Sequence, residues 1–214
     1  MKKILSLALA ALMLVSCIAC FASCGDSIKG VKVIEIKLSE EEYAFAVQKG
    51  DTELLTKLNA FMAEIKANGK FDEIVNKYFG DGTPTAVTSA SEMKTDGSQL
   101  IVATNAAFAP FEYKDGDKFA GIDMEIAAYI AEKLGMELVI MDMEFDSVVS
   151  SVGKNGVDVA MAGLTVNETR KEFVNFTSTY YNAAQMLVVP ADNTDFDACK
   201  TAEDVLAVLA EQAK

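Results

Sequence analysis

A short segment, Gly163-Leu-Thr165-Val-Asn167-Glu-Thr-Arg170, combines groups suited to holding a small anion. Asn167 is a good N-cap residue, so the segment is expected to lead into a helix whose first N–H groups attract negative charge. Thr165 adds a hydroxyl, and the planar guanidinium of Arg170 matches a carboxylate. Glycine at position 163 lets a ligand approach the backbone closely. An arginine in a first helical turn is usually only solvated, but these neighbours favour carboxylate binding.

Aromatic residues gather in the segment 105–113, directly after a predicted strand, at Phe108, Phe111 and Tyr113. Exposed rings at the end of a strand can form the wall of a pocket, and each contributes about 0.5–1.5 kcal/mol beyond simple burial. We expect Phe111 to cap the hydrophobic core. For Phe108, core packing and a pocket wall are equally consistent with the sequence.

The composition excludes much of ordinary enzyme chemistry. The chain of 214 residues has no histidine, which removes Ser-His-Asp triads, Cys-His dyads and the usual zinc ligand sets. No pair of carboxylates suits general acid–base catalysis and no glycine-rich phosphate loop is present, so we expect no enzyme activity, metal or cofactor. The formal net charge of −13 repels phosphate backbones and disfavours nucleic-acid partners.

The elements that would position these residues alternate between strand and helix after residue 98. The sequence predicts strands over 99–104, 136–142, 157–162 and 184–190, and helices over 122–134, 145–154, 167–172 and 200–213. Such alternation predicts an α/β fold with an open, mainly parallel sheet flanked by helices. Ligands of these sheets bind beyond the carboxyl ends of the strands, so we expect the site in the predicted loops over 105–121 and 163–170.

The region before residue 98 has a different organisation. It predicts strands over 31–38 and 42–48, followed by helices over 51–67 and 71–79. The stretch 80–98 is rich in glycine, serine, threonine and aspartate, which is typical of a linker.

The first 24 residues predict export from the cytoplasm. A basic start precedes an apolar run to about Val15, which is too short to span a bilayer. Cys17 and Cys24 each follow small residues, as in the lipobox of bacterial lipoproteins. Cys24, which the polar Gly25-Asp26-Ser27 follows, is the preferred acylation site, with Cys17 as the other candidate. A cleaved signal peptide and an uncleaved N-terminal anchor remain open as alternatives.

Two long runs carry a family resemblance. ATNAAFAPFEYKDGDKFAGIDMEIAAYIAEKLG (103–135) contains a strand, the aromatic segment and a helix, and FDSVVSSVGKNGVDVAMAGLTVNETRKEFVNFTSTYY (145–181) contains the Arg170 turn. Both resemble the extracellular solute-binding proteins of bacterial ABC importers for polar amino acids, the periplasmic binding proteins of type II, family 3. The resemblance implies one lobe of such a protein, which is not an enzyme and delivers an amino acid to an ABC permease.

The resemblance also implies ligand contacts at six positions, namely Asn105, Phe108, Phe145, Gly163, Thr165 and Arg170. In the family, an arginine at the position of Arg170 holds the α-carboxylate, helped by the turn that precedes it. Rings at the positions of Phe108 and Phe145 enclose the ligand. Asn105 falls where relatives that bind basic amino acids tend to carry an aspartate, which favours an uncharged or polar ligand.

The order of the similar pieces is unusual. The segment 41–80 (EEYAFAVQKGDTELLTKLNAFMAEIKANGKFDEIVNKYFG) resembles the family's C-terminal part, yet here it comes first. The resemblance therefore implies a circularly permuted lobe. Residues 25–80 would supply a hinge strand and two helices, 81–98 a linker, 99–190 the ligand-binding lobe, and 191–214 a helical segment where the second lobe would begin.

The expected function is amino-acid binding outside the cell membrane by a lipid-anchored or periplasmic component of an ABC importer. The alternative is an incomplete lobe that acts as an interaction or structural module without binding solute. Because the half-pocket would be uncovered, self-association or a complementary lobe is a further expected partner.

Overall fold

The computed structural model describes residues 30–94 and 96–213, which form two compact units. One unit comprises Ser39–Ala184, and the other comprises the described residues up to Leu38 together with those from Gln185 onward. The signal segment, with both candidate acylation sites Cys17 and Cys24, lies outside the described residues. No helix within the described ranges has the length and apolar character needed to cross a bilayer.

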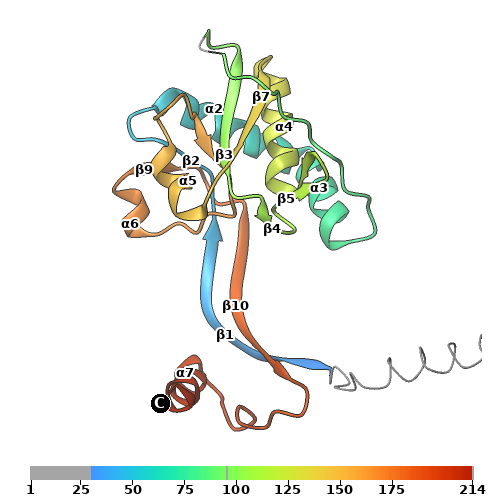
Figure 1. Ribbon diagram of the computed structural model, residues 1–214, viewed down its shortest axis with the longest axis vertical. Coiled ribbons are helices and arrows are strands. Elements are labelled where there is room, and N and C mark those ends of the chain that lie inside the picture. The colour runs from blue at the N-terminus through green and yellow to red at the C-terminus, as the bar shows by residue number, and fades with distance from the viewer. Residues whose placement is uncertain (1–29, 95, 214) are drawn as a thin grey trace, which may run out of the picture. The chain divides into compact units, whose positions relative to one another are not determined.

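A five-stranded sheet forms the centre of the larger unit (Figure 1). Its strands lie in the order β7 (Glu137–Asp142), β3 (Gln99–Thr104), β8 (Val159–Ala160), β2 (Ala46–Gln48) and β9 (Val174–Phe176). Strand β3 pairs in parallel with β7 and β8, whereas β2 is antiparallel to both of its neighbours. All strands except β2 therefore share one direction, which confirms the predicted open, mainly parallel sheet.

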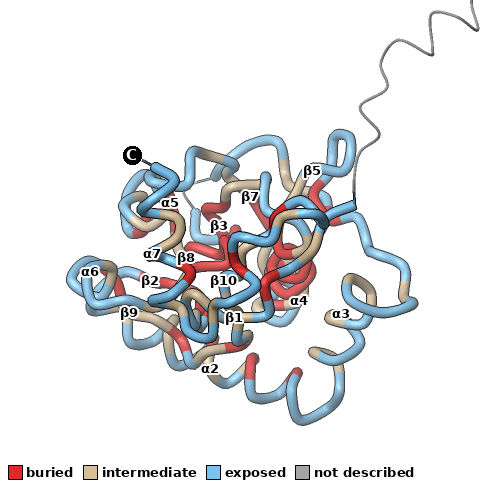
Figure 2. Tube along the Cα trace, turned by 90° about the horizontal axis from the view of Figure 1, so that it is seen from below, coloured by how far each residue is buried: buried red, intermediate tan, exposed pale blue. Residues whose placement is uncertain are grey.

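Helices cover both faces of this sheet because successive side chains of a strand point to opposite faces, and the apolar strands are buried on both. Leu100 and Val102 of β3 face a core shared with α2 (Thr52–Ala67), α3 (Lys70–Phe79) and α4 (Ile122–Leu134). Ile101 and Ala103 face the opposite side, where α5 (Phe145–Ser151) packs. In Figure 2, the buried positions gather along β3, β8 and α4.

A small antiparallel sheet occupies the segment that the sequence analysis treated as a loop. It consists of β4 (Ala107–Phe108), β5 (Glu112–Asp115) and β6 (Lys118–Ala120). Strands this short contain too few positions for a recognisable alternation, so the prediction of an irregular loop over 105–121 was wrong. The single predicted strand over 42–48 is also wrong, because the structure ends one strand at Tyr43 and starts β2 at Ala46.

The described residues of segment 80–98 form no named helix or strand, but hydrogen bonds tie them to the rest of the larger unit. Val87 pairs with Phe119 of β6, and the Ala90 N–H donates to the Leu138 carbonyl of β7 at 2.8 Å. The Ser89 hydroxyl accepts a hydrogen bond from the Ile140 N–H. The segment predicted as a linker therefore lies as a strap along the larger unit.

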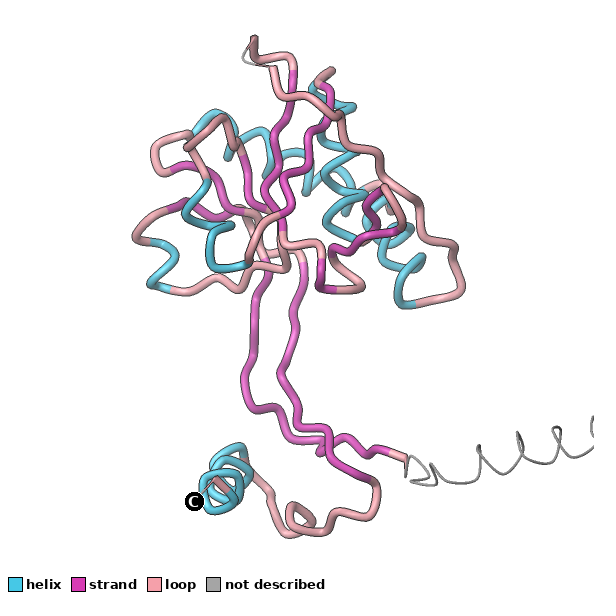
Figure 3. The backbone as a smooth tube through the Cα atoms, in the orientation of Figure 1, coloured by secondary structure: helices cyan, strands magenta, loops and turns pink. Residues whose placement is uncertain are grey.

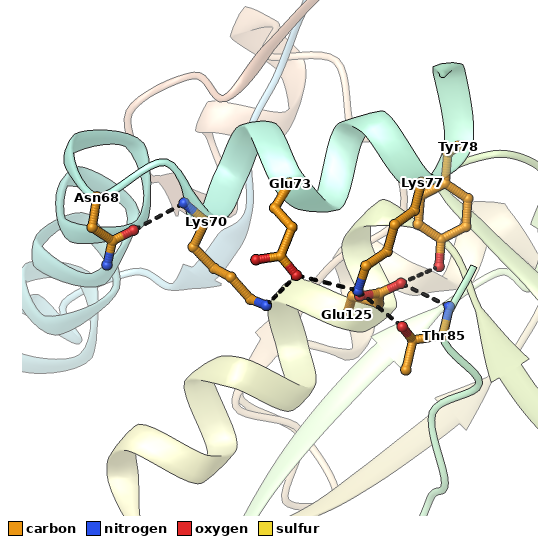
Figure 4. A network of polar contacts seen from close by, with 7 residues as sticks. All are labelled: Asn68, Lys70, Glu73, Lys77, Tyr78, Thr85 and Glu125. Carbon is orange, nitrogen blue, oxygen red and sulfur yellow. Dashed lines mark hydrogen bonds and ion pairs between the residues drawn. The ribbon is translucent and has the colours of Figure 1, made fainter. Parts of the chain in front are cut away.

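One buried ion pair secures the start of this strap (Figure 4). Glu125 of α4 lies 2.6 Å from the Lys77 ammonium of α3. The same carboxylate accepts hydrogen bonds from the Tyr78 hydroxyl and from the Thr85 N–H. Because Thr85 belongs to the strap, a single carboxylate joins both helices to it.

The smaller unit is built on two long strands and one helix. Strands β1 (Val31–Tyr43) and β10 (Tyr181–Pro190) form a two-stranded sheet, drawn in magenta in Figure 3, and both continue into the larger unit. Helix α7 (Ala202–Gln212) begins with a capping box formed by Thr201 and Asp204. A small apolar cluster holds the unit together, and its buried members are Ile34, Val189, Phe196 and Val205.

Candidate functional site

Arg170 is held in place by contacts on three sides. It lies in the short helix α6 (Glu168–Lys171), where its N–H donates to the capping side chain of Asn167 at 2.8 Å. Its Nη1 donates to the Thr165 carbonyl at 2.8 Å, and its guanidinium carbon lies 5.2 Å from the centre of the Phe145 ring. Burial lowers the pKa of Arg170 from its ordinary value, but an arginine remains charged at neutral pH.

The turn before α6 presents the backbone of Thr165 toward the same side. Thr165 forms an isolated antiparallel pair with Tyr43, in which Ala44 and Val166 donate the flanking hydrogen bonds. In such a pair, the N–H and carbonyl of the central residue both point away from the partner strand. The carbonyl meets Arg170, so the Thr165 N–H also points to the side where that guanidinium lies.

Gly163 has a positive φ of 51° and lies against an aromatic ring. A Cβ atom at this position would lie 3.0 Å from Cε1 of Phe108, so a side chain here would push the ring away by a few tenths of an ångström. Its N–H donates to Oδ2 of Asp123 at 2.9 Å. Because that N–H is already engaged, the Thr165 N–H is the donor of this turn that we expect a ligand to meet beside Arg170.

The two rings predicted to enclose a ligand are both exposed on the larger unit. Phe108 is 42% exposed and Phe145 is 40% exposed. Phe108 stacks on Phe111, with ring centroids 5.6 Å apart, and Phe111 is buried as the sequence analysis expected. The Phe108 ring lies against Gly163 and the Arg170 guanidinium lies over the Phe145 ring, so the turn 163–170 has one of the two rings near each end.

Asn105 contributes differently. Its side-chain amide donates to the Met143 carbonyl at 2.8 Å, which ties the end of β3 to the segment that leads into α5. The next residue, Ala106, donates its N–H to the carboxylate of Asp142. Asn105 therefore positions the segment that carries Phe145, and its amide oxygen is the group it has left to accept from a ligand.

A recess of about 260 Å³ adjoins Arg170, between α5 and α6. Its walls include Phe145 and Arg170, together with residues that the sequence analysis did not single out, namely Asp146, Val149, Ser150, Thr169 and Phe173. Periodicity on α5 could have indicated Val149, but nothing in the sequence signals that α5 and α6 face each other.

Sequence reasoning also missed two buried carboxyl groups beside the Gly163 turn. Glu112 and Asp123 are fully buried, and neither carboxyl oxygen of Glu112 has a hydrogen-bond partner within the described part of the chain. Burial, assisted by the charge of Asp123, raises the pKa of Glu112 to about 11. Burial raises the pKa of Asp123 to about 7, against the lowering effect of hydrogen bonds from Gly163 and Tyr180. The available signal was an acidic residue inside each of two apolar stretches.

Comparison with known sequences matches this chain to a protein family. The profile of the bacterial extracellular solute-binding proteins, family 3, matches residues 6–81 and 100–212. Arginine-binding extracellular protein ArtP of Bacillus subtilis is 37% identical over 106 residues, which cover 50% of this chain and 42% of ArtP. The probable amino-acid-binding protein YxeM of the same organism is 33% identical, covering 49% of this chain and 40% of YxeM. A probable histidine-binding protein of Campylobacter jejuni is 26% identical, covering 58% of this chain and 46% of that protein. The chain spans less than half the length of these relatives.

Solved structures also align with part of the chain. The arginine-bound form of truncated ArgBP from T. maritima is 39% identical, with a TM-score of 0.38, and covers 39% of this chain and 40% of that one. A Phe57Trp mutant of domain 1 of TmArgBP, also arginine-bound, is 32% identical, with a TM-score of 0.39, and covers 54% of this chain and 92% of that one.

Proposed function

The chain belongs to the bacterial extracellular solute-binding proteins of family 3, and from that premise we propose that the unit 39–184 binds an amino acid by its α-carboxylate. The guanidinium of Arg170 and the N–H of Thr165 hold the carboxylate. The rings of Phe108 and Phe145 flank the bound molecule. The protein serves an ABC importer from the outer side of the membrane, where acylation of Cys24 or Cys17 tethers it.

One observation carries this proposal: the guanidinium of Arg170 is oriented before any ligand arrives. The Thr165 carbonyl and the Phe145 ring restrain it at 2.8 Å and 5.2 Å. A restrained fork loses less conformational entropy when a carboxylate binds, and a charge-assisted hydrogen bond contributes about 1.5–3 kcal/mol. The neighbouring N–H of Thr165 adds a donor on the same side.

The side chain of the ligand is best matched by a hydrogen-bonding group. Asn105 donates one amide N–H to the Met143 carbonyl, which leaves its amide oxygen as an acceptor and its second N–H as a donor. The relatives named for arginine and for histidine make these two amino acids the first to test. A neutral asparagine at this position also accepts uncharged donors such as the amide of glutamine.

Calorimetric titration of the protein with each standard amino acid tests the proposal. Saturable binding of one or a few amino acids is expected, and Arg170→Ala should abolish it. Lys171→Ala is the matched control, because it removes a neighbouring cation that is exposed and paired with Glu168. Lys171→Ala should keep the affinity within twofold. The proposal fails if no amino acid binds to the folded protein, or if Arg170→Ala binds as well as the parent.

The exposed rings favour a second candidate, a lobe that docks on a protein without binding solute. Phe79, Phe108, Phe145 and Phe173 are each at least 40% exposed on the same unit. Apolar surface of this kind is often covered by a partner, which here would be a second copy or a complementary lobe. Sedimentation at micromolar concentrations separates the two candidates. Self-association without amino-acid binding supports the docking lobe, and a monomer that binds an amino acid excludes it.

A further inference from the structure

Two fully buried carboxyl groups connect the walls of the proposed binding surface. Asp123, at the start of α4, accepts the Gly163 N–H at Oδ2 and the Tyr180 hydroxyl at Oδ1. Glu112, in β5, pairs across the small sheet with Phe108. One carboxyl group therefore holds the turn that contains Gly163, and the other sits opposite the ring that packs against that glycine.

The contacts of the pair suggest which group holds a proton. Asp123 accepts a hydrogen bond at each of its oxygens, as a carboxylate does. Glu112 has no hydrogen-bond partner in the described ranges, and an isolated buried anion is far costlier than a neutral acid. Two anions cannot share such an apolar space, so a single proton belongs on Glu112.

The neighbouring titratable groups do not change the charge of the Glu112–Asp123 pair. Tyr180 and Tyr43, from the neighbouring segments, are phenols whose pKa burial raises further, so both stay neutral. Glu125, on the same helix as Asp123, is engaged by Lys77 and Tyr78. The charge of the pair is therefore set mainly by its own protons.

We propose that Glu112 and Asp123 are positioning residues that hold one proton between them and, in that state, fix the Gly163 turn for ligand binding. The effect on affinity rests on the proposed function, whereas the effect on the turn does not. A second proton makes one Asp123 oxygen a hydroxyl, which competes with its two donors and loosens Gly163. Loss of the last proton places two anions side by side, which forces β5 away from α4.

The Gly163 amide reports on this directly. Only two glycines follow an alanine in the sequence, Gly121 and Gly163, so alanine labelled at its carbonyl carbon combined with ¹⁵N-glycine isolates their two amide signals. The Gly163 signal of the full chain should move with pH, with an inflection near neutrality and a second change at alkaline pH. Gly121 lies against the backbone of Glu112, so its signal should follow the alkaline change, but its N–H donates to Tyr78 rather than to Asp123 and should not show the inflection near neutrality.

Three variants assign the inflections to the two carboxyl groups. Asp123→Asn should remove the inflection near neutrality. Glu112→Gln, a neutral isostere, should keep that inflection and lose the alkaline change. Tyr180→Phe should move the inflection to higher pH, because it removes a hydrogen bond that favours the Asp123 carboxylate. This mild variant keeps the test open if Asp123→Asn does not fold. The proposal is overturned if the Gly163 signal inflects near pH 4, or is flat from pH 5 to 10, or behaves alike in parent and variants.

The affinity measurement adds the functional consequence. For the amino acid found by calorimetry, the affinity of the parent should rise several-fold from pH 6 to pH 8. Asp123→Asn should bind about 10- to 100-fold more weakly at pH 8, as expected for a lost hydrogen bond to a charged group, and Glu112→Gln should bind within twofold of the parent. If no amino acid binds, the proposed function fails while the amide titration still decides the role of the pair. If an amino acid binds normally but the Gly163 amide signal is insensitive to pH, only the proposed role of Glu112 and Asp123 is rejected.

Discussion

The guanidinium of Arg170 donates a hydrogen bond to the carbonyl oxygen of Thr165 at 2.8 Å. The N–H of Thr165 points to the same side, away from the strand that contains Tyr43. Arginine and turn are thus locked together before a carboxylate arrives. Since Arg170 is also the only arginine in the sequence, no other side chain can supply a bidentate fork.

Arg170→Lys should therefore weaken amino-acid binding although it keeps the charge. Lysine lacks the planar fork that lies over Phe145, so we expect a loss of about 10- to 30-fold in affinity, within the range for a charge-assisted hydrogen bond. Calorimetry measures the affinity, and thermal unfolding should move little. Equal binding by the lysine variant would mean that Arg170 acts as a point charge only.

Gly163→Ala should impair both folding and binding. The new Cβ would lie 3.0 Å from the Phe108 ring in a backbone with positive φ, which costs about 1–3 kcal/mol of unfolding free energy. Gly116→Ala is the matched control, since Gly116 also has a positive φ of 63° but its Cβ would meet nothing within 4 Å. Denaturant unfolding and calorimetry should show a larger stability loss in Gly163→Ala, and a binding loss only there. Similar losses in the two variants would mean that the contact with Phe108 contributes little to stability or binding.

The Lys77–Glu125 pair should matter far more than a surface pair. Glu125→Gln leaves the largely buried Lys77 ammonium with only the more distant carboxylate of Glu73, at 3.8 Å, and we expect about 2–4 kcal/mol of lost unfolding free energy. Glu137→Gln removes the partner of Lys94 in an exposed pair, where a loss of at most about 1 kcal/mol is expected. Urea unfolding of both variants tests this. Equal losses would show that the strap is not secured by the buried pair.

Stability should fall as pH rises because of Glu112. Its folded-state pKa is raised by burial, so the folded protein binds the proton more tightly than the unfolded chain does. The contribution is fully present below about pH 4.3, the ordinary glutamate value, and is lost as pH rises toward about 11. The slope is at most about 1.4 kcal/mol per pH unit for one proton. Glu112→Gln carries no such proton, so its unfolding free energy should decline less between pH 5.5 and pH 8.5. Parallel curves for parent and variant would contradict this.

The sequence predicted the long, periodic elements well. The helix over 122–134 and the strand over 99–104 match the structure at both ends, because apolar residues recur along them at a clear period and Gly135 ends the helix. Strands of two to four residues, such as β4 and β9, carry no period and were missed.

The residues of the site also fall into two groups, those that a local sequence pattern reveals and those that only tertiary packing brings together. Gly163, Thr165 and Arg170 lie within eight positions of one another, so local motif and turn chemistry were enough to group them. Asp123 lies 40 residues from Gly163 in the sequence, and only the packing of α4 against the sheet brings the two together. Their contact is a property of tertiary structure, and no local pattern could reveal it.

The interior position of β2 has a consequence for how the chain folds. Ala46 pairs with Ala160 on one side and Phe176 on the other, so the strand waits for partners that are synthesised much later. Pairings this distant raise the contact order, and loop-closure entropy opposes them until most of the chain is available. Strand β2 must therefore stay unpaired during synthesis, and the central sheet should close in a late, slow step that can be followed by stopped-flow refolding.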